Sequence, residues 1–188
     1  MNRNNNMEHT LKTDRLIIRI ARPEDAEAIF SYRSDCIVNQ YQGWIPNSIE
    51  EVRRCIINMP ETIDVANLYI QFVVLNLKEN RLIGDMAISF SNHDNMQAEI
   101  GCTLDKAFQN KGYATEAMKG MVDYLFSTMH KHRIVVSVDP RNTASLRLIE
   151  RIGFRKEAHF KKSYYLRGEW VDDIIYAKLK EEWIIEHL

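Results

Sequence analysis

Residues 97–104 (QAEIGCTL) alternate strictly between apolar and polar side chains. A period of two is typical of a β-strand, in which successive side chains point to opposite faces of a sheet. The predicted apolar face carries Ala98, Ile100, Cys102 and Leu104. The opposite face carries Gln97, Glu99, Gly101 and Thr103. We therefore expect a strand with one buried face and one face available for chemistry.

Helical spacing and capping residues mark four other segments. The predicted helices cover residues 23–30, 48–58, 113–129 and 142–152. The third repeats apolar residues every three or four positions, which is the spacing of an amphipathic helix. Ser48 and Glu51 form a capping box, Pro23 suits a first helical position, and Gly153 suits a helix end.

Short β-branched and apolar runs predict the remaining strands. They cover residues 15–21, 68–75, 82–90 and 133–139, and two more strands flank a turn at 167–169. The order is β-α-α-β-β-β-α-β-α-β-β, in which an antiparallel meander gives way to a βαβ crossover. This order predicts an α/β (α+β) fold.

Composition places this fold in one domain. The chain has 188 residues, of which 45% are hydrophobic and 27% charged, which are ordinary globular values. We expect residues 1–9, rich in Asn, to be a disordered leader and residues 10–188 to be a single domain. The segment 1–9 lacks the hydrophobic region of a signal peptide, and no apolar run has the length of a membrane helix.

Charge and cysteine content narrow the class of function. The formal net charge of −1 provides no overall field for binding nucleic acid or an anionic membrane. Cys36, Cys55 and Cys102 are an odd number without metal-binding spacing, so we expect neither disulfides nor a metal site. These features favour a cytoplasmic protein with no nucleic-acid or membrane partner.

The candidate chemistry begins at residues 109–114 (QNKGYA), which follow a strand and open a helix. A helix N-terminus offers unpaired backbone N–H groups, and a glycine there lets an anion approach closely. Neither a Walker loop nor a GxGxxG fingerprint is present. A phosphate group of another kind, such as a pyrophosphate, fits this position.

Gln109, Gly112 and Ala114 match the motif [QR]-x-x-G-x-[GA], and the chain here resembles the GNAT acetyltransferase superfamily. Residues 142–145 (NTAS) and 152–154 (IGF) are similar to a second motif of that family. The segments 13–19 (TDRLIIR) and 168–172 (GEWVD) resemble the branch that contains ribosomal-protein N-terminal acetyltransferases. The resemblance covers nearly the whole chain after Thr13 and implies a mixed, mostly antiparallel sheet of about seven strands with a central βαβ crossover.

The resemblance also implies that acetyl-CoA is the co-substrate and that no metal takes part. Pantetheine would lie between two splayed strands and bond the backbone of Cys102, Thr103 and Leu104. The implied pyrophosphate loop contains Gln109, Asn110, Lys111, Gly112, Tyr113, Ala114 and Thr115. Asn142 would bond pantetheine or a water. Lys111 or Arg147 would reach the 3′-phosphate, the alternative being an ordinary solvated cation.

Direct attack of an amine on the thioester needs a base and an acid. Glu99 is the candidate base, acting through a water, and an exposed structural carboxylate is the alternative. Many GNAT enzymes place a Tyr seven residues after the Asn, but Ile149 stands there. Ser145 is the candidate acid in its place, and a hydroxyl that only bonds CoA is the alternative. If Glu99 is not the base, His93, His159 and Asp173 are the next candidates.

The acceptor would lie between the loop joining the first two helices and the last hairpin. Tyr41, Trp44 and Trp170 are the candidate contacts there, with packing as the alternative for both tryptophans. The branch favours a protein or peptide N-terminal amine. A small amine such as an amino acid, polyamine or antibiotic, and a CoA-binding module without catalysis, stay open, and a homodimer is compatible with the sequence.

Overall fold

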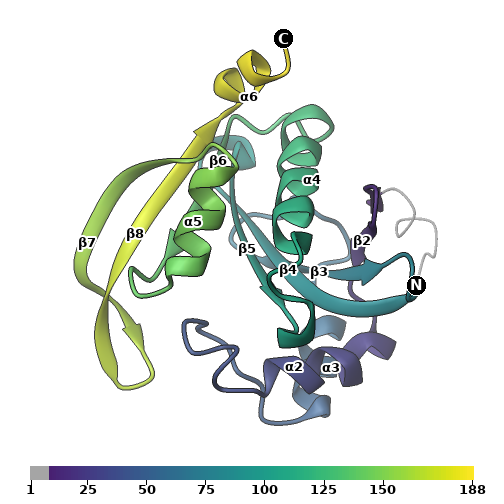
Figure 1. The fold of residues 1–188 in the computed structure, drawn as a ribbon. Helices are drawn as coiled ribbons and strands as arrows, with labels where there is room; N and C mark the ends of the chain where they lie inside the picture. The colour runs from purple at the N-terminus through teal and green to yellow at the C-terminus, as the bar shows by residue number, and fades with distance from the viewer. Residues whose placement is uncertain (1–8) are drawn as a thin grey trace.

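Eight strands form one sheet in the computed structural model, which describes residues 9–188 (Figure 1). In sheet order they are β1 (Leu11–Lys12), β2 (Leu16–Ile20), β3 (Tyr69–Asn76), β4 (Arg81–Ser91), β5 (Gln97–Leu104), β6 (Arg133–Val138), β8 (Glu169–Leu179) and β7 (Arg155–Leu166). All neighbouring strands are antiparallel except β5 and β6. The predicted mixed, mostly antiparallel sheet with one parallel crossover is therefore confirmed.

Helices cover both faces of this sheet. They are α2 (Ala26–Arg33), α3 (Ile49–Ile57), α4 (Tyr113–Ser127), α5 (Thr143–Arg151) and α6 (Lys180–Glu186). Short 3-10 turns lie at Pro23–Asp25, His93–Asn95 and Lys106–Phe108. Ser48 caps α3 by accepting a hydrogen bond from the Glu51 backbone at 3.1 Å, but the Glu51 carboxylate accepts from the Asn47 backbone (2.9 Å) instead of closing the predicted capping box at Ser48.

The structure differs from the sequence prediction at three places. The sheet has one strand more than about seven because the two-residue β1 pairs with β2. The helix expected from Pro23 begins as a 3-10 turn and continues as α2 to Arg33. Helix α6 was not predicted, since it is only seven residues long and its N-cap residue is Leu179 rather than Ser, Thr, Asp or Asn. The leader prediction concerns residues outside the described part, apart from His9, which lies 2.6 Å from the Tyr124 hydroxyl.

The parallel pair β5–β6 holds together for only three residues. Residues 97–99 pair with residues 133–135. Beyond Glu99, β5 stays bonded to β4 as far as Leu104, while β6 stays bonded to β8 as far as Val138. The two strands therefore separate, and α4 and α5 lie on the two sides of the opening (Figure 1).

The two faces of the sheet differ in what covers them. Even-numbered residues of β5 and β6, such as Ala98, Ile100 and Val136, join the large core beneath α4 and α5. Helices α2 and α3 form a second, smaller core with Val73 of β3. The odd-numbered face around Glu99 and Gly101 carries no helix and is exposed. Thr103 shares that face but is buried, because it pairs with Asp85 under α2.

A charged cluster fixes α2 on the sheet. The fully buried Asp85 carboxylate accepts hydrogen bonds from the side chains of Tyr32 (2.7 Å), Arg33 (2.6 and 3.0 Å) and Gln71 (2.9 Å). Full pairing of this kind is what a buried carboxylate needs. It sets the position at which the chain leaves α2 for the loop toward α3.

No helix in the described part of the chain is long and apolar enough to cross a membrane. Residues 9–188 also hold no group of three His, Cys, Asp or Glu side chains arranged to bind a metal ion.

Candidate active site

The start of α4 forms an anion-binding loop. Gly112 is its N-cap residue, with a left-handed φ of 81°, and Asn110 has a φ of 59°. No side chain caps this helix, so the backbone N–H groups of its first turn face outward unpaired. Gln109 fixes the approach to the loop by donating a hydrogen bond to the Leu104 carbonyl at 3.0 Å. These features would suit an anion, and pyrophosphate binding by this loop stays a prediction.

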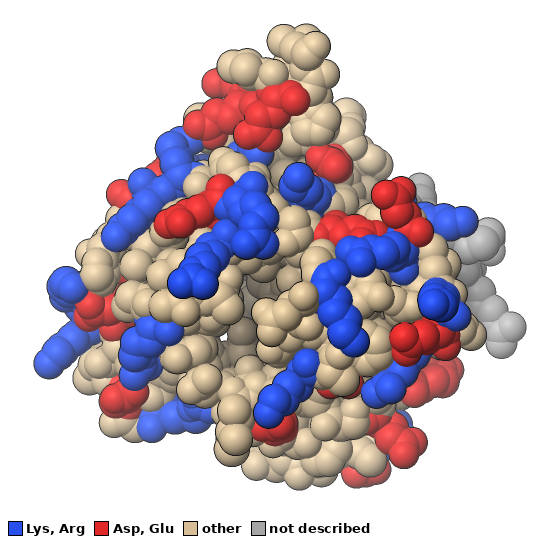
Figure 2. Space-filling model, viewed as in Figure 1, with Lys and Arg blue, Asp and Glu red and all other residues tan. Residues whose placement is uncertain are grey.

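Basic side chains surround this loop. Figure 2 shows Lys and Arg on both sides of a hollow near the middle of the face, over α5 and over the start of α4. Arg15 donates a hydrogen bond to the Lys111 carbonyl (3.1 Å) and stacks on the Tyr113 ring (4.4 Å). Arg151 of α5 reaches Thr115 at 3.5 Å, while Arg147 is exposed on the same helix.

Arg15 and Arg151 are basic residues at the loop that sequence reasoning missed. Arg15 stands in the TDRLIIR segment, which was used only as a family signature. Its ion pair with Glu116 (2.6 Å) holds it against the loop. The spacing of hydrophobic residues predicts helices and strands, but it does not predict which basic residues from distant segments will contact this loop.

A cavity of about 100 Å³ occupies the opening between β5 and β6. Its walls come from both faces of the sheet and from the loop before α3. They include Tyr41, Gln42, Gly101, Cys102, Met118, Val136, Ser137, Val138, Asp139, Asn142, Ser145, Leu148 and Ile149. The opening therefore connects the helix-covered face to the exposed polar face.

Asn142 and Ser145 both line this cavity from the first turn of α5. Asn142 is the N-cap, and its side-chain oxygen accepts a hydrogen bond from the Ser145 backbone at 3.1 Å. The Ser145 hydroxyl makes no hydrogen bond with any described residue. Ile149 is buried one turn later and offers no hydroxyl at the position where a Tyr was expected.

Cys102 lines the same cavity, and its thiol is shielded from reaction. Burial, with a further contribution from Asp85, raises the pKa of the Cys102 thiol to about 12. A thiol with this pKa stays protonated at neutral pH and is a poor nucleophile. The expectation that Cys102 contributes backbone rather than sulfur chemistry agrees with this environment.

Glu99 lies on the exposed face beside the opening. Burial by surrounding protein, and then the negative charge of Asp173, raise the pKa of Glu99. Asp173 in turn accepts a hydrogen bond from the Ser137 hydroxyl at 2.7 Å, and Ser137 lines the cavity. Burial, followed by the nearby charges of Glu99 and Tyr164, raises the pKa of Tyr69. The two carboxylates and two phenols form a polar patch where a cationic amine would be attracted.

The predicted acceptor contacts lie in different places. Tyr41, in the loop before α3, lines the cavity between the strands and also a second, larger cavity. Trp44 packs with the smaller core and donates a hydrogen bond to Glu51 at 3.1 Å. Trp170 stacks on Tyr165 with ring centroids 5.3 Å apart and lines neither cavity.

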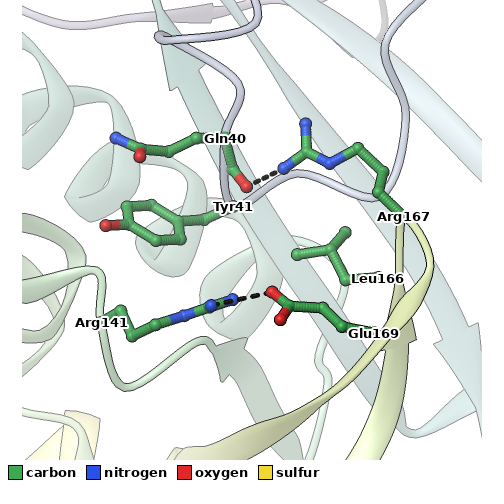
Figure 3. Close-up of a pocket in the computed structure, with 6 residues that line it drawn as sticks. All are labelled: Gln40, Tyr41, Arg141, Leu166, Arg167 and Glu169. Carbon is green, nitrogen blue, oxygen red and sulfur yellow. Dashed lines mark hydrogen bonds and ion pairs between the residues drawn. The ribbon is translucent and has the colours of Figure 1, made fainter.

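The second cavity has a volume of about 370 Å³ and lies between the loop before α3 and the β7–β8 hairpin (Figure 3). Its lining residues are Gln40, Tyr41, Arg141, Leu166, Arg167 and Glu169. Arg167 donates hydrogen bonds to the carbonyls of Asn39 and Gln40, which ties the hairpin to the loop. Sequence reasoning missed Arg141 and Arg167, because only folding brings the loop and the hairpin together.

Comparison with known proteins identifies the class. Residues 15–155 match the model of the acetyltransferase (GNAT) domain. The chain is 36% identical over 177 residues to an uncharacterized N-acetyltransferase, YnaD, of Bacillus subtilis (strain 168), covering 92% of this chain and 98% of that one. It is 26% identical over 185 residues to the [ribosomal protein uS5]-alanine N-acetyltransferase of Escherichia coli (strain K12), covering 92% of each chain.

Solved structures agree with this class. A GNAT-family acetyltransferase from Bacillus anthracis matches with a TM-score of 0.81 and 34% identity, over 92% of this chain and 99% of that one. The spermidine N-acetyltransferase from Vibrio cholerae, solved with CoA and spermine, has a TM-score of 0.80 over 92% of this chain and 99% of that one. Its 21% identity shows the fold alone.

The chain therefore belongs to the GNAT acetyltransferase family. It is an acetyl-CoA-dependent N-acetyltransferase.

Proposed function

We propose that this enzyme acetylates the N-terminal α-amine of a protein or peptide by direct attack in a ternary complex with acetyl-CoA. The observation that supports this proposal is the cavity in the opening between β5 and β6, because Ser137 on its wall donates a hydrogen bond to Asp173, whose charge acts on Glu99. The amine and the thioester would meet at that opening.

The binding steps follow from the loop and the strands. Backbone N–H groups of residues 110–115 hold the pyrophosphate, with Arg15, Lys111 and Arg147 as nearby cations. The backbone of Cys102 and Thr103, on the unpaired edge of β5, bonds the pantetheine amides as an added strand would. Acetyl-CoA supplies the acetyl thioester, and these contacts fix where it lies.

The proton steps are assigned to two side chains. Glu99 removes a proton from the attacking amine, directly or through a water, and backbone N–H groups of β5 stabilise the oxyanion. The Ser145 hydroxyl donates a proton to the departing thiolate, and its proton is restored from solvent. A raised pKa makes Glu99 a stronger base than an ordinary carboxylate when it is ionised.

Two considerations favour an α-amine over other amines. An α-amine has a pKa of about 8, so its neutral fraction at physiological pH is far larger than that of an alkylamine, whose pKa lies near 10.4. The polar patch is bordered by exposed aromatic side chains, Tyr69 and Tyr164, which suit a peptide chain. A relative that acts on ribosomal-protein alanine by name, matched over 92% of both chains, agrees with this choice.

A panel of acceptors at saturating acetyl-CoA tests the proposal. It would contain short peptides with free N-termini, the same peptides N-terminally blocked but carrying lysine, and spermidine. We expect CoA release with the free N-termini and none with the blocked peptides, and mass spectrometry should locate the acetyl group on the α-amine. Faster turnover of spermidine than of every peptide would instead make this a small-amine acetyltransferase.

A further inference from the structure

The larger cavity adjoins the proposed acceptor site, and its charged wall residues are Arg141, Arg167 and Glu169. Tyr41 borders both cavities, and Asp139, which lines the smaller one, pairs with Arg141 of the larger one at 2.6 Å. A peptide that leaves the amine site along the hairpin would pass into this cavity. Figure 3 shows Arg141 and Arg167 entering it from opposite sides, from the loop after β6 and from the hairpin.

The two guanidinium groups differ in their charge balance. Arg141 is paired with Asp139 (2.6 Å) and with Glu169 (2.9 Å), whose side chain is exposed. Arg167 bonds only the backbone carbonyls of Asn39 and Gln40, and no carboxylate of residues 9–188 lies within ion-pair distance of it. Its positive charge is therefore uncompensated at the edge of the cavity.

We propose that the acceptor carries a carboxylate, and that Arg167 binds it in this cavity. This inference rests on the proposed acetylation of a peptide N-terminus and specifies which peptides are preferred. The amine would lie at Glu99 and Asp173, and the acidic group at Arg167. Such an acceptor has a cationic amine for the acidic patch at Glu99 and Asp173 and an anionic group for the basic Arg167.

Spacing along β6 indicates where the acidic group stands in the peptide. Ser137, bonded to Asp173, and Asp139, bonded to Arg141, are two residues apart, which is about 7 Å along a strand. An extended peptide advances about 3.3–3.6 Å per residue. An Asp or Glu at the second or third position would span about this distance, from Asp173 to the Arg141 side of the cavity, whereas the α-carboxylate of a free amino acid lies too close to its amine.

Guanidinium groups bind carboxylates with strong, directional hydrogen bonds. The same groups repel a second positive charge, so the cavity disfavours an acceptor with a cation beyond the reacting amine. A polyamine would meet that repulsion at Arg167. The charge of this cavity therefore distinguishes an acidic peptide from a polycationic small amine.

The experiment compares peptides that differ only in charge at the second and third positions, with Glu, Gln or Lys there, and includes free glutamate. We expect kcat/KM for the Glu peptide to exceed that for the Gln peptide about tenfold, with the Lys peptide lower still. Arg167→Gln should reduce the Glu-to-Gln ratio to nearly one, while Arg167→Lys retains most of it. Glu169→Gln should increase the ratio, because a negative charge that repels the acceptor carboxylate is removed from the cavity wall.

Arg53→Gln, at an exposed pair on α3, is the matched control and should leave the ratio unchanged. Equal kcat/KM for the three peptides would overturn the inference and leave the proposed function standing. If Arg167→Gln lowers kcat/KM equally for all three peptides, Arg167 only holds the hairpin to the loop, and the inference is also overturned. Turnover of free glutamate as fast as the Glu peptide would overturn the spacing. If no peptide is acetylated, the proposed function fails and the inference fails with it.

Discussion

Ser137 donates a hydrogen bond to Asp173 at 2.7 Å, and this contact connects the opening of the sheet to the charge that acts on Glu99. Because burial and then the charge of Asp173 raise the pKa of Glu99, its carboxyl group ionises at a higher pH than usual. A base works only in its ionised form, so activity should fall as pH decreases through this raised pKa. Asp173→Asn should lower the pKa of Glu99 and shift the acidic limb of the kcat profile to lower pH.

Glu99→Gln keeps the shape of the side chain and removes its charge. We expect kcat near pH 7 to fall about 10²-fold or more, with partial recovery towards pH 9 as the free-amine fraction rises. A Glu99 that only anchors the acceptor would raise KM at nearly constant kcat. The measurement is kcat against pH for both proteins at saturating acetyl-CoA and acceptor. Coincident curves would remove Glu99 as the base and leave His93, His159 and Asp173 to be tested.

Gly112→Asp should abolish CoA binding, because it places a Cβ and a negative charge at the anion-binding loop. Acetyl-CoA at about 100 times its dissociation constant should stabilise the wild type by roughly 2.7 kcal/mol, measured by thermal unfolding. Gly168→Asp is the matched control, since Gly168 also has positive φ (94°) and nothing within 4 Å of an added Cβ. Equal stabilisation by acetyl-CoA in the folded Gly112 variant would contradict the assignment of this loop.

Ser145→Ala removes the hydroxyl while keeping the backbone N–H that Asn142 accepts from. If Ser145 protonates the thiolate, kcat should fall with little change in acetyl-CoA affinity; if it only binds CoA, affinity should fall first. Ser127→Ala, at an exposed hydroxyl near the far end of α4, serves as control. Unchanged rates in the Ser145 variant would exclude it from the mechanism.

Much of this architecture could be predicted from local patterns. The alternation in β5 located Glu99 on the exposed face, and the residues around Gly112 and Asn142 located the starts of α4 and α5. These predictions succeeded because each depends on neighbours a few residues away. Thr103 shows the limit of such reasoning: alternation placed it on the same face as Glu99, but α2 covers that end of the strand and buries it.

The rest of the site depends on contacts between distant segments. Arg15, near the N-terminus, contacts Lys111 in the loop before α4, and Arg167 bonds a residue more than a hundred positions away. Neither hydrophobic periodicity nor helix-capping residues predict these long-range contacts. The cavity between the loop before α3 and the hairpin was therefore outside sequence reasoning, although Tyr41 on its wall was already a candidate acceptor contact and remains one.

The environment of Cys102 gives a chemical test of how the opening is packed. Burial and Asp85 raise the pKa of its thiol to about 12, whereas Cys36 and Cys55 are exposed. Because alkylation requires the thiolate, iodoacetamide at pH 7.5 should modify the two exposed cysteines and spare Cys102. Mass spectrometry of native and denatured protein counts the modified sites, and all three should react after denaturation. Rapid labelling of Cys102 in the native protein, blocked by added CoA, would mean that the opening admits reagent and that the thiol is not shielded.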